Sequence, residues 1–135
     1  MDKYNHEGYP DPTAAKALDN IIKTAKTYMP LVYIASPFAG DMEYNIKKAR
    51  DYCRFAVDKN CIPIAPHLHY PQFMDDSDKD ERDLGLFFAL VLLGHCDELW
   101  VFGDRVSNGI SREIEKAVKR GIPIKKYNSR CEEVR

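Results

Sequence analysis

Residues 103–117 (GDRVSNGISREIEKA) carry the side chains whose types and spacing are best suited to chemistry. Ser107 and Gly109 lie at the mouth of a predicted helix, where free backbone N–H groups favour an anion. Glu113 falls about one turn inside that helix, so its carboxylate can reach a ligand held by the serine and the glycine. A capped helix with a solvated glutamate explains the same pattern, and the sequence leaves both interpretations open.

A second carboxylate, Asp83, stands at the start of an apolar stretch. Paired with Glu113 across a crevice, it would complete the residue set that glycosyl transfer uses, with one carboxylate as nucleophile and the other as acid or proton shuttle. Charged residues ahead of an apolar helix, here Glu81, Arg82 and Asp83, also serve as simple helix caps. Both readings of Asp83 remain open at this point.

Two other segments could contact a ligand. Residues 36–40 (SPFAG) form a small-residue turn whose backbone N–H groups could cradle a ligand. The chain has neither a GxGxxG nor a GxxxxGK[ST] motif, which argues against NAD and ATP.

His67 and His69 could share a metal ion, so a metal-dependent hydrolase is one alternative, although no third ligand follows at a diagnostic spacing.

The elements that must position these residues alternate between strand and helix. Apolar patterns predict strands over 31–36, 61–65, 98–102 and 122–127, and helices over 13–28, 41–60, 81–96 and 107–120. Residues 67–80 are the longest predicted loop. The helix over 81–96 is apolar on nearly all sides, so it is expected to be buried. We expect a loose arm over 1–12, a single domain over 13–128 and a tail over 129–135.

This alternation predicts an α/β domain of three layers with a parallel sheet, which binds ligands beyond the carboxyl ends of its strands. The length of 135 residues suits one domain, and the net charge of −1 argues against a nucleic-acid binder. The longest near-apolar run, residues 84–94, is too short to span a membrane. The four cysteines form no CxxC pair, and a soluble, cytoplasmic protein without disulfides is expected.

Three segments resemble the nucleoside 2-deoxyribosyltransferase-like superfamily: VYIASPFAG at 32–40, ERDLG at 81–85 and CDELWVFGDRVSNGISREIEKAVKRGIPI at 96–124. The most specific part is the S-x-G-x-x-x-E-x-x-x-A pattern of Ser107, Gly109, Glu113 and Ala117, which follows an apolar strand. More closely, the chain resembles an uncharacterised bacterial and phage-borne branch that is related to deoxynucleoside 5′-monophosphate N-glycosidases.

The resemblance implies a five-stranded flavodoxin-like or Rossmann-like fold and a reaction at a 2′-deoxyribonucleoside. By this likeness Glu113 would be the nucleophile, Asp83 would hydrogen-bond or protonate the departing base, and Tyr33 would orient the Glu113 carboxylate. The substrate-binding residues would be Ser36, Pro37, Phe38, Gly40, His67, Arg82, Gly103, Asp104, Ser107 and Gly109. The family needs no metal or organic cofactor, and its members are typically homo-oligomers in which a neighbour completes the pocket.

The chain departs from the monophosphate hydrolases in the first loop. Phe38 and Ala39 stand where those enzymes carry an arginine for the phosphate, and Arg82 and Arg105 are candidates to replace it. The predicted helix over 13–28 is an addition to the basic fold that could serve assembly. A non-catalytic sensor module that binds a nucleotide or nucleoside derivative is the main alternative to an N-glycosidase or deoxyribosyltransferase, because fold does not fix function. A structural or interaction protein is a further alternative.

Overall fold

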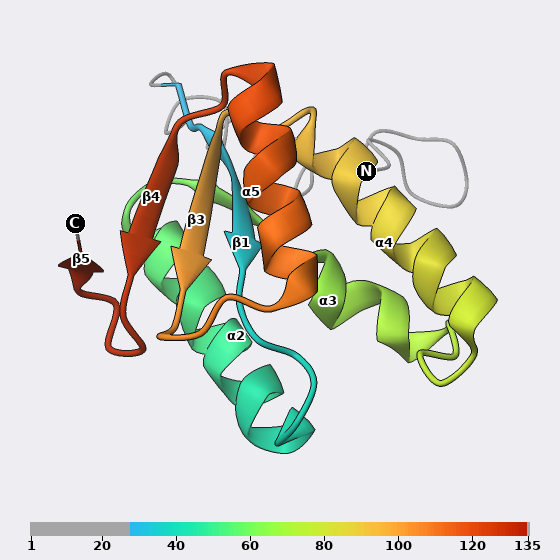
Figure 1. The fold of residues 1–135 in the computed structure, drawn as a ribbon. Coiled ribbons are helices and arrows are strands. Elements are labelled where there is room, and N and C mark those ends of the chain that lie inside the picture. Colours follow the sequence, from blue (N-terminus) through green and yellow to red (C-terminus); the bar gives the residue numbers. More distant parts are fainter. Residues whose placement is uncertain (1–27, 135) are drawn as a thin grey trace, which may run out of the picture.

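The computed structural model describes residues 28–134, which form an α/β domain around one five-stranded sheet (Figure 1). The strand order is β2-β1-β3-β4-β5. The strands are β1 (Leu31–Ala35), β2 (Ile62–Ile64), β3 (Glu98–Phe102), β4 (Ile124–Tyr127) and β5 (Glu133–Val134). The first four pair in parallel and β5 is antiparallel to β4. This order is that of the flavodoxin-like doubly wound fold, so the predicted fold class is confirmed.

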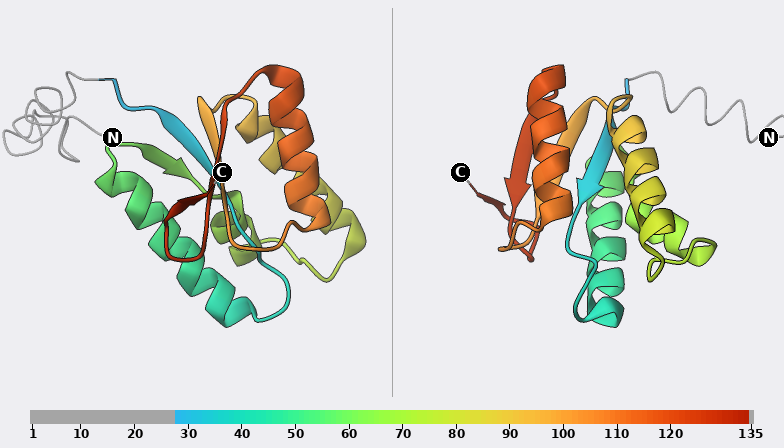
Figure 2. Two further views of the ribbon diagram at one scale, coloured as in Figure 1. Left: turned by 60° about the vertical axis from the view of Figure 1, so that its left-hand side comes forward. Right: turned by 45° about the vertical axis from the view of Figure 1, so that its right-hand side comes forward.

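Helices cover both faces of the sheet (Figure 2). They are α2 (Met42–Asp58), α3 (Pro66–His69), the short 3-10 helix η1 (Tyr70–Gln72), α4 (Lys79–Leu93) and α5 (Asn108–Arg120). Asp41, Asp78 and Ser107 cap the N-termini of α2, α4 and α5 through their side-chain oxygens. The arm predicted over 1–12 and all but the last residue of the helix predicted over 13–28 lie outside the described residues.

Alternation along the strands builds two separate cores, because successive side chains of a strand point to opposite faces. Odd-numbered residues of β1 and β3 face α4 and α5; they are Tyr33, Ala35, Leu99 and Val101. Even-numbered residues of the same strands face α2; they are Val32, Ile34, Trp100 and Phe102. The two cores therefore share a backbone but no side chains.

Two predicted elements differ from the structure. The predicted loop over 67–80 contains α3 and η1, because Pro66 suits the first turn of a helix, where no N–H donor is needed. The helix predicted over 81–96 begins earlier, at Lys79, and is not buried on all sides. Ala89 and Leu93 face the core, whereas Leu84, Phe87 and Val91 are 46%, 60% and 41% exposed. Only one side of α4 packs on the sheet, so its apolar composition did not make it a buried helix.

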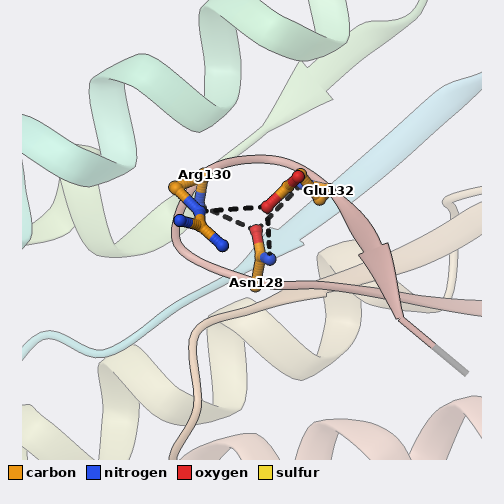
Figure 3. Close-up of polar contacts among 3 residues, drawn as sticks. All are labelled: Asn128, Arg130 and Glu132. Carbon is orange, nitrogen blue, oxygen red and sulfur yellow. Dashed lines mark hydrogen bonds and ion pairs between the residues drawn. The ribbon is translucent and has the colours of Figure 1, made fainter.

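The end of the chain folds back through a network of polar contacts (Figure 3). Asn128 Oδ1 accepts hydrogen bonds from the backbone N–H groups of Arg130, at 2.9 Å, and of Glu132, at 3.0 Å. Glu132 Oε1 accepts from Asn128 Nδ2 at 2.9 Å and from Arg130 Nε at 3.0 Å. This turn leads into β5, a strand within the segment that the sequence presents as a tail. Within residues 28–134, no helix has the length and apolar character to cross a bilayer.

Candidate functional site

A cavity of about 570 Å³ opens at the carboxyl end of the parallel sheet, where this fold class binds its ligands. Its wall comes from the end of β1 and the loop that follows, from α3 and η1, and from the N-terminal halves of α4 and α5. Segments far apart in the sequence thus meet at one place (Figure 1).

Glu113 is the buried carboxylate of this cavity. The buried face of α5 is formed by Ile110, Glu113 and Ala117, so the helical period places a charged residue where packing alone would favour an apolar one. Glu113 is 9% exposed, and no group among the described residues hydrogen-bonds to its Oε2. A buried oxygen without a partner is costly to a fold, and such groups concentrate at functional sites.

Tyr33 is the polar neighbour that affects the pKa of Glu113. It lies on β1, is 2% exposed, and forms a side-chain hydrogen bond with Glu113. Burial raises the pKa of Glu113 to about 7, and the Tyr33 hydrogen bond opposes that rise. Burial, followed by the Glu113 charge, raises the pKa of Tyr33 well above its usual value, so its hydroxyl stays protonated and donates.

Ser36 and His67 form a second polar pair on the cavity wall. Ser36 Oγ and His67 Nε2 lie 2.9 Å apart, and the ring of Phe38 meets the His67 ring edge-on at 6.5 Å between centroids. Burial lowers the pKa of His67 to about 4, so the imidazole is neutral at pH 7. This pair can therefore exchange hydrogen bonds with a ligand without adding charge.

The N-terminus of α5 presents a small, polar surface to the cavity. Ser107 Oγ accepts a hydrogen bond from the backbone N–H of Ile110 at 3.2 Å. A methyl group at Gly109 would meet only the Ser107 hydroxyl oxygen, at 3.8 Å, which is an ordinary contact. Packing within the domain therefore does not require a glycine there, and the open space beside Gly109 is available to a ligand.

The cavity gathers most of the residues singled out from the sequence. Those that line it are Tyr33, Ser36, Pro37, Phe38, His67, Arg82, Asp83, Ser107, Gly109 and Glu113. Gly40, Gly103 and Asp104 do not line it. Gly40 and Gly103 have φ angles of 96° and 99°, so both shape turns, and Gly103 packs beside Pro37. Asp104 follows Gly103 into solvent.

The two arginine candidates and the two histidines separate in the structure. Arg82 lines the cavity and Arg105 does not. His67 faces Ser36, whereas His69 packs against the rings of Tyr70 and Phe73. Over the described range, no three His, Cys, Asp or Glu side chains are grouped so that they could hold a metal ion.

Several lining residues were not identified from the sequence, among them Tyr70, Met74, Asn108 and Arg112. Tyr70 and Met74 lie in the segment that was expected to be a loop. Asn108 and Arg112 flank Gly109 and Glu113 in the chain, so their places within the first turns of α5 were a usable signal.

Comparisons with known proteins agree with the fold. The structure of a 2-deoxyribosyltransferase from the psychrotolerant bacterium Bacillus psychrosaccharolyticus is similar, with a TM-score of 0.57 at 19% identity over 73% of this chain and 72% of that one. A conserved protein from Enterococcus faecalis V583 gives a TM-score of 0.52 at 21% identity over 74% of this chain and 64% of that one. At these identities the likeness shows the fold alone. The comparison with curated proteins gives no significant match.

A family model covers the domain from just before β1 to the end of β4. It is described as a domain of unknown function, DUF7768, and it matches residues 30–127. That range contains every residue that lines the cavity. The chain therefore belongs to the DUF7768 family.

Proposed function

We propose that this protein cleaves the N-glycosidic bond of a nucleoside or nucleotide, or transfers its 2-deoxyribosyl group, with Glu113 as the nucleophile. The observation that carries the proposal is the Glu113 carboxylate: buried, oriented by Tyr33, free at Oε2 and on the wall of a cavity of nucleoside size. Drug-sized ligands occupy cavities of about 300–1,000 Å³, which brackets the volume found here. The fold shared with a 2-deoxyribosyltransferase supports the same chemistry.

The first step forms a bond between Glu113 and the sugar. An ionised Glu113 oxygen attacks C1′, the bond from C1′ to the base nitrogen breaks, and its electron pair leaves with the base. Positive charge develops on the sugar ring in the transition state, and a carboxylate next to C1′ stabilises that charge. Asp83, which lines the cavity from α4, gives its carboxyl proton to the departing base and becomes a carboxylate.

The second step frees the enzyme. Water or a second nucleobase attacks C1′, the bond from C1′ to the Glu113 oxygen breaks, and its electron pair returns to the carboxylate. The Asp83 carboxylate takes up the proton lost by the attacking group, which restores the starting state. Water gives hydrolysis and a base gives transfer, so the same residues serve either outcome.

Burial of Glu113 has two consequences for this reaction. A desolvated carboxylate is a stronger nucleophile and interacts more strongly with a developing cation than a hydrated one. The same burial raises its pKa to about 7, so only part of the protein carries the reactive form at neutral pH. The Tyr33 hydrogen bond offsets some of that cost because it favours the ionised form.

The test is release of free base, measured by chromatography after incubation with the common deoxynucleosides and their 5′-monophosphates. We expect release by the wild type and by Glu115→Gln, a matched control because Glu115 is exposed on the same helix. Glu113→Gln and Glu113→Ala should abolish release while the circular dichroism spectrum stays unchanged. Normal turnover by a folded Glu113→Ala protein would disprove the mechanism.

A negative result is informative as well. If no substrate is cleaved but one of them raises the melting temperature of the wild type, the cavity binds without turnover and the protein is a binding module. Asp83→Asn should lower the rate of base release more than it weakens binding. A variant whose main defect is affinity would count against a role for Asp83 in the departure of the base.

A further inference from the structure

The outer side of α4 is an apolar surface that the described residues leave open. Residues 84–93 (LGLFFALVLL) contain no polar or charged side chain, and only one side of this stretch faces the core. Leu84, Phe87 and Val91 are exposed and lie at positions i, i+3 and i+7, which places them in one stripe along the helix. Figure 1 shows α4 at the edge of the domain, away from the central strands. A continuous stripe of this kind is typical of a helix that packs against another element.

The chain enters the domain beside the end of α4. Leu31 N donates to Asp97 Oδ2 and Asp97 N donates to the Leu31 carbonyl oxygen, both at 2.8 Å. Tyr28 also hydrogen-bonds to Asp97 through its side chain. Asp97 follows closely on Leu93, the last residue of α4. The segment that precedes Tyr28 is therefore tethered within reach of the C-terminal end of the exposed stripe.

That segment has an apolar pattern of the same length and spacing as the stripe. Residues 13–27 lie outside the described residues, and their sequence predicts an amphipathic helix. A helix of this length spans ~22 Å, the same as α4. Leu18, Ile21 and Ala25 are spaced i, i+3 and i+7, as Leu84, Phe87 and Val91 are.

The separation in sequence between the two apolar patterns equals the separation between Leu31 and Asp97, the residues that hold the start of β1 beside the end of α4. Leu31 and Asp97 are 66 positions apart, and the register of β1 with β3 has the same offset. The same offset pairs Leu18 with Leu84, Ile21 with Phe87 and Ala25 with Val91. A helix that leads into β1 as α4 leads into β3 would thus run parallel to α4 with the two apolar stripes at the same height.

We propose that residues 13–27 form a helix that docks in parallel on the Leu84, Phe87 and Val91 stripe of α4 in the same chain. The tether favours this occupant over a second copy, because a short connection gives an effective concentration that reaches about millimolar. Docking would remove apolar surface of both helices from water, which is the main favourable term in such an association. The docked helix would lie alongside the element that supplies Arg82 and Asp83 to the cavity.

The test measures protection of the segment by limited digestion with trypsin, which can cut after Lys16, Lys23 and Lys26. In the full-length wild type we expect slow cleavage at these sites. Phe87→Asp, which places a charge in the stripe, should speed cleavage at all of them at least tenfold. Val118→Asp is the matched control, because Val118 is an exposed apolar residue on α5, at 68% exposure, outside the stripe. It should leave the cleavage rate unchanged.

Two outcomes of the digestion would overturn the proposal. Rapid cleavage in the wild type, equal to that in Phe87→Asp, would mean that the segment does not dock. Protection that is lost on dilution, together with a dimer in analytical ultracentrifugation, would mean that a second copy covers the stripe.

A double-mutant cycle of Ile21→Ala and Phe87→Ala in urea unfolding gives an independent test of the contact between the two helices. A coupling of zero between the two sites would contradict the pairing.

Discussion

The two faces of the sheet are packed by different kinds of side chain. On the α2 face, Phe102 stacks on Tyr52 and on Tyr127 at centroid distances of 4.2 and 4.9 Å. On the α4 and α5 face the core is built from smaller aliphatic residues, and it contains Glu113 next to Tyr33. One face is a continuous aromatic core, and the other opens into the cavity.

This difference separates the face that stabilises the domain from the face that holds the candidate site. Stacked aromatic rings contribute large buried areas and favourable ring geometry. A buried carboxylate with an unpaired oxygen lowers the stability of the folded state, because its charged form is poorly solvated. The α2 face can therefore stabilise the backbone that holds Glu113 in place. Substitutions on the two faces should accordingly move stability and activity in different directions.

The largest effect is expected at Glu113. Glu113→Gln should lower base release by more than about a thousandfold, because the proposed nucleophile is lost. The same substitution should raise the free energy of unfolding at pH 8. Since the folded pKa is raised from 4.5 to about 7, the native state binds the proton more tightly and loses stability as pH rises through that range. At ~1.4 kcal/mol per pH unit, the gain has an upper limit of about 3 kcal/mol.

Urea unfolding of Glu113→Gln and of the wild type at pH 5 and pH 8 checks this sign. The stability difference between the two proteins should be larger at pH 8. A glutamine variant that is less stable than the wild type at pH 8 would mean that the carboxylate helps to hold the fold together.

The next largest effect is expected on the aromatic face. Phe102 is fully buried, and Phe102→Ala should lower the free energy of unfolding by about 3–5 kcal/mol through lost burial and a cavity. Phe73→Ala is the control, because Phe73 is 63% exposed and its loss should cost less than about 1 kcal/mol. Equal losses for the two variants, measured by urea unfolding, would contradict the assignment of the stability core.

The pH dependence of activity tests the cavity face. The proposed mechanism needs an ionised Glu113, so kcat/KM should fall about tenfold per pH unit well below the pKa of about 7, or about fiftyfold from pH 7 to pH 5. His67, with a pKa lowered to about 4, stays neutral over most of this range and should not contribute. A pH–rate profile of the wild type and of His67→Asn measures the acid limb. An acid limb with its midpoint near pH 4.5 would show that the Glu113 carboxylate is solvated.

The smallest effect is expected at the mouth of α5. Gly109→Ala should raise the melting temperature slightly, since alanine favours a helix by about 0.5–1 kcal/mol over glycine and the site has room for a methyl group. The methyl group would occupy space on the cavity wall, and we expect KM to rise about tenfold, equivalent to ~1.4 kcal/mol. Ser111→Ala, on the exposed side of α5, is the control. An unchanged KM would remove Gly109 from the binding surface.

Much of the fold was predictable because its signals are local. The apolar runs at β1 and β3, the aspartate that caps α2 and the glycine that ends α5 each act on their own neighbours in the chain. The strand β5 was missed because only two residues form it, and its pairing depends on the turn built by Asn128 and Glu132. The exposed side of α4 was missed because composition reports how apolar a helix is and not how many of its sides find a partner.

The features of the cavity also divide into those set by local sequence and those set by tertiary contacts. The sequence by itself determined that a serine, a glycine and a glutamate share the first turns of one helix, because that spacing follows from the helical period. Only the tertiary structure decided that Glu113 is buried beside Tyr33, and that Ser36 meets His67 across 31 positions of the chain. Burial and pKa depend on neighbours that converge through the sheet, and such convergence has no periodic signature in the sequence.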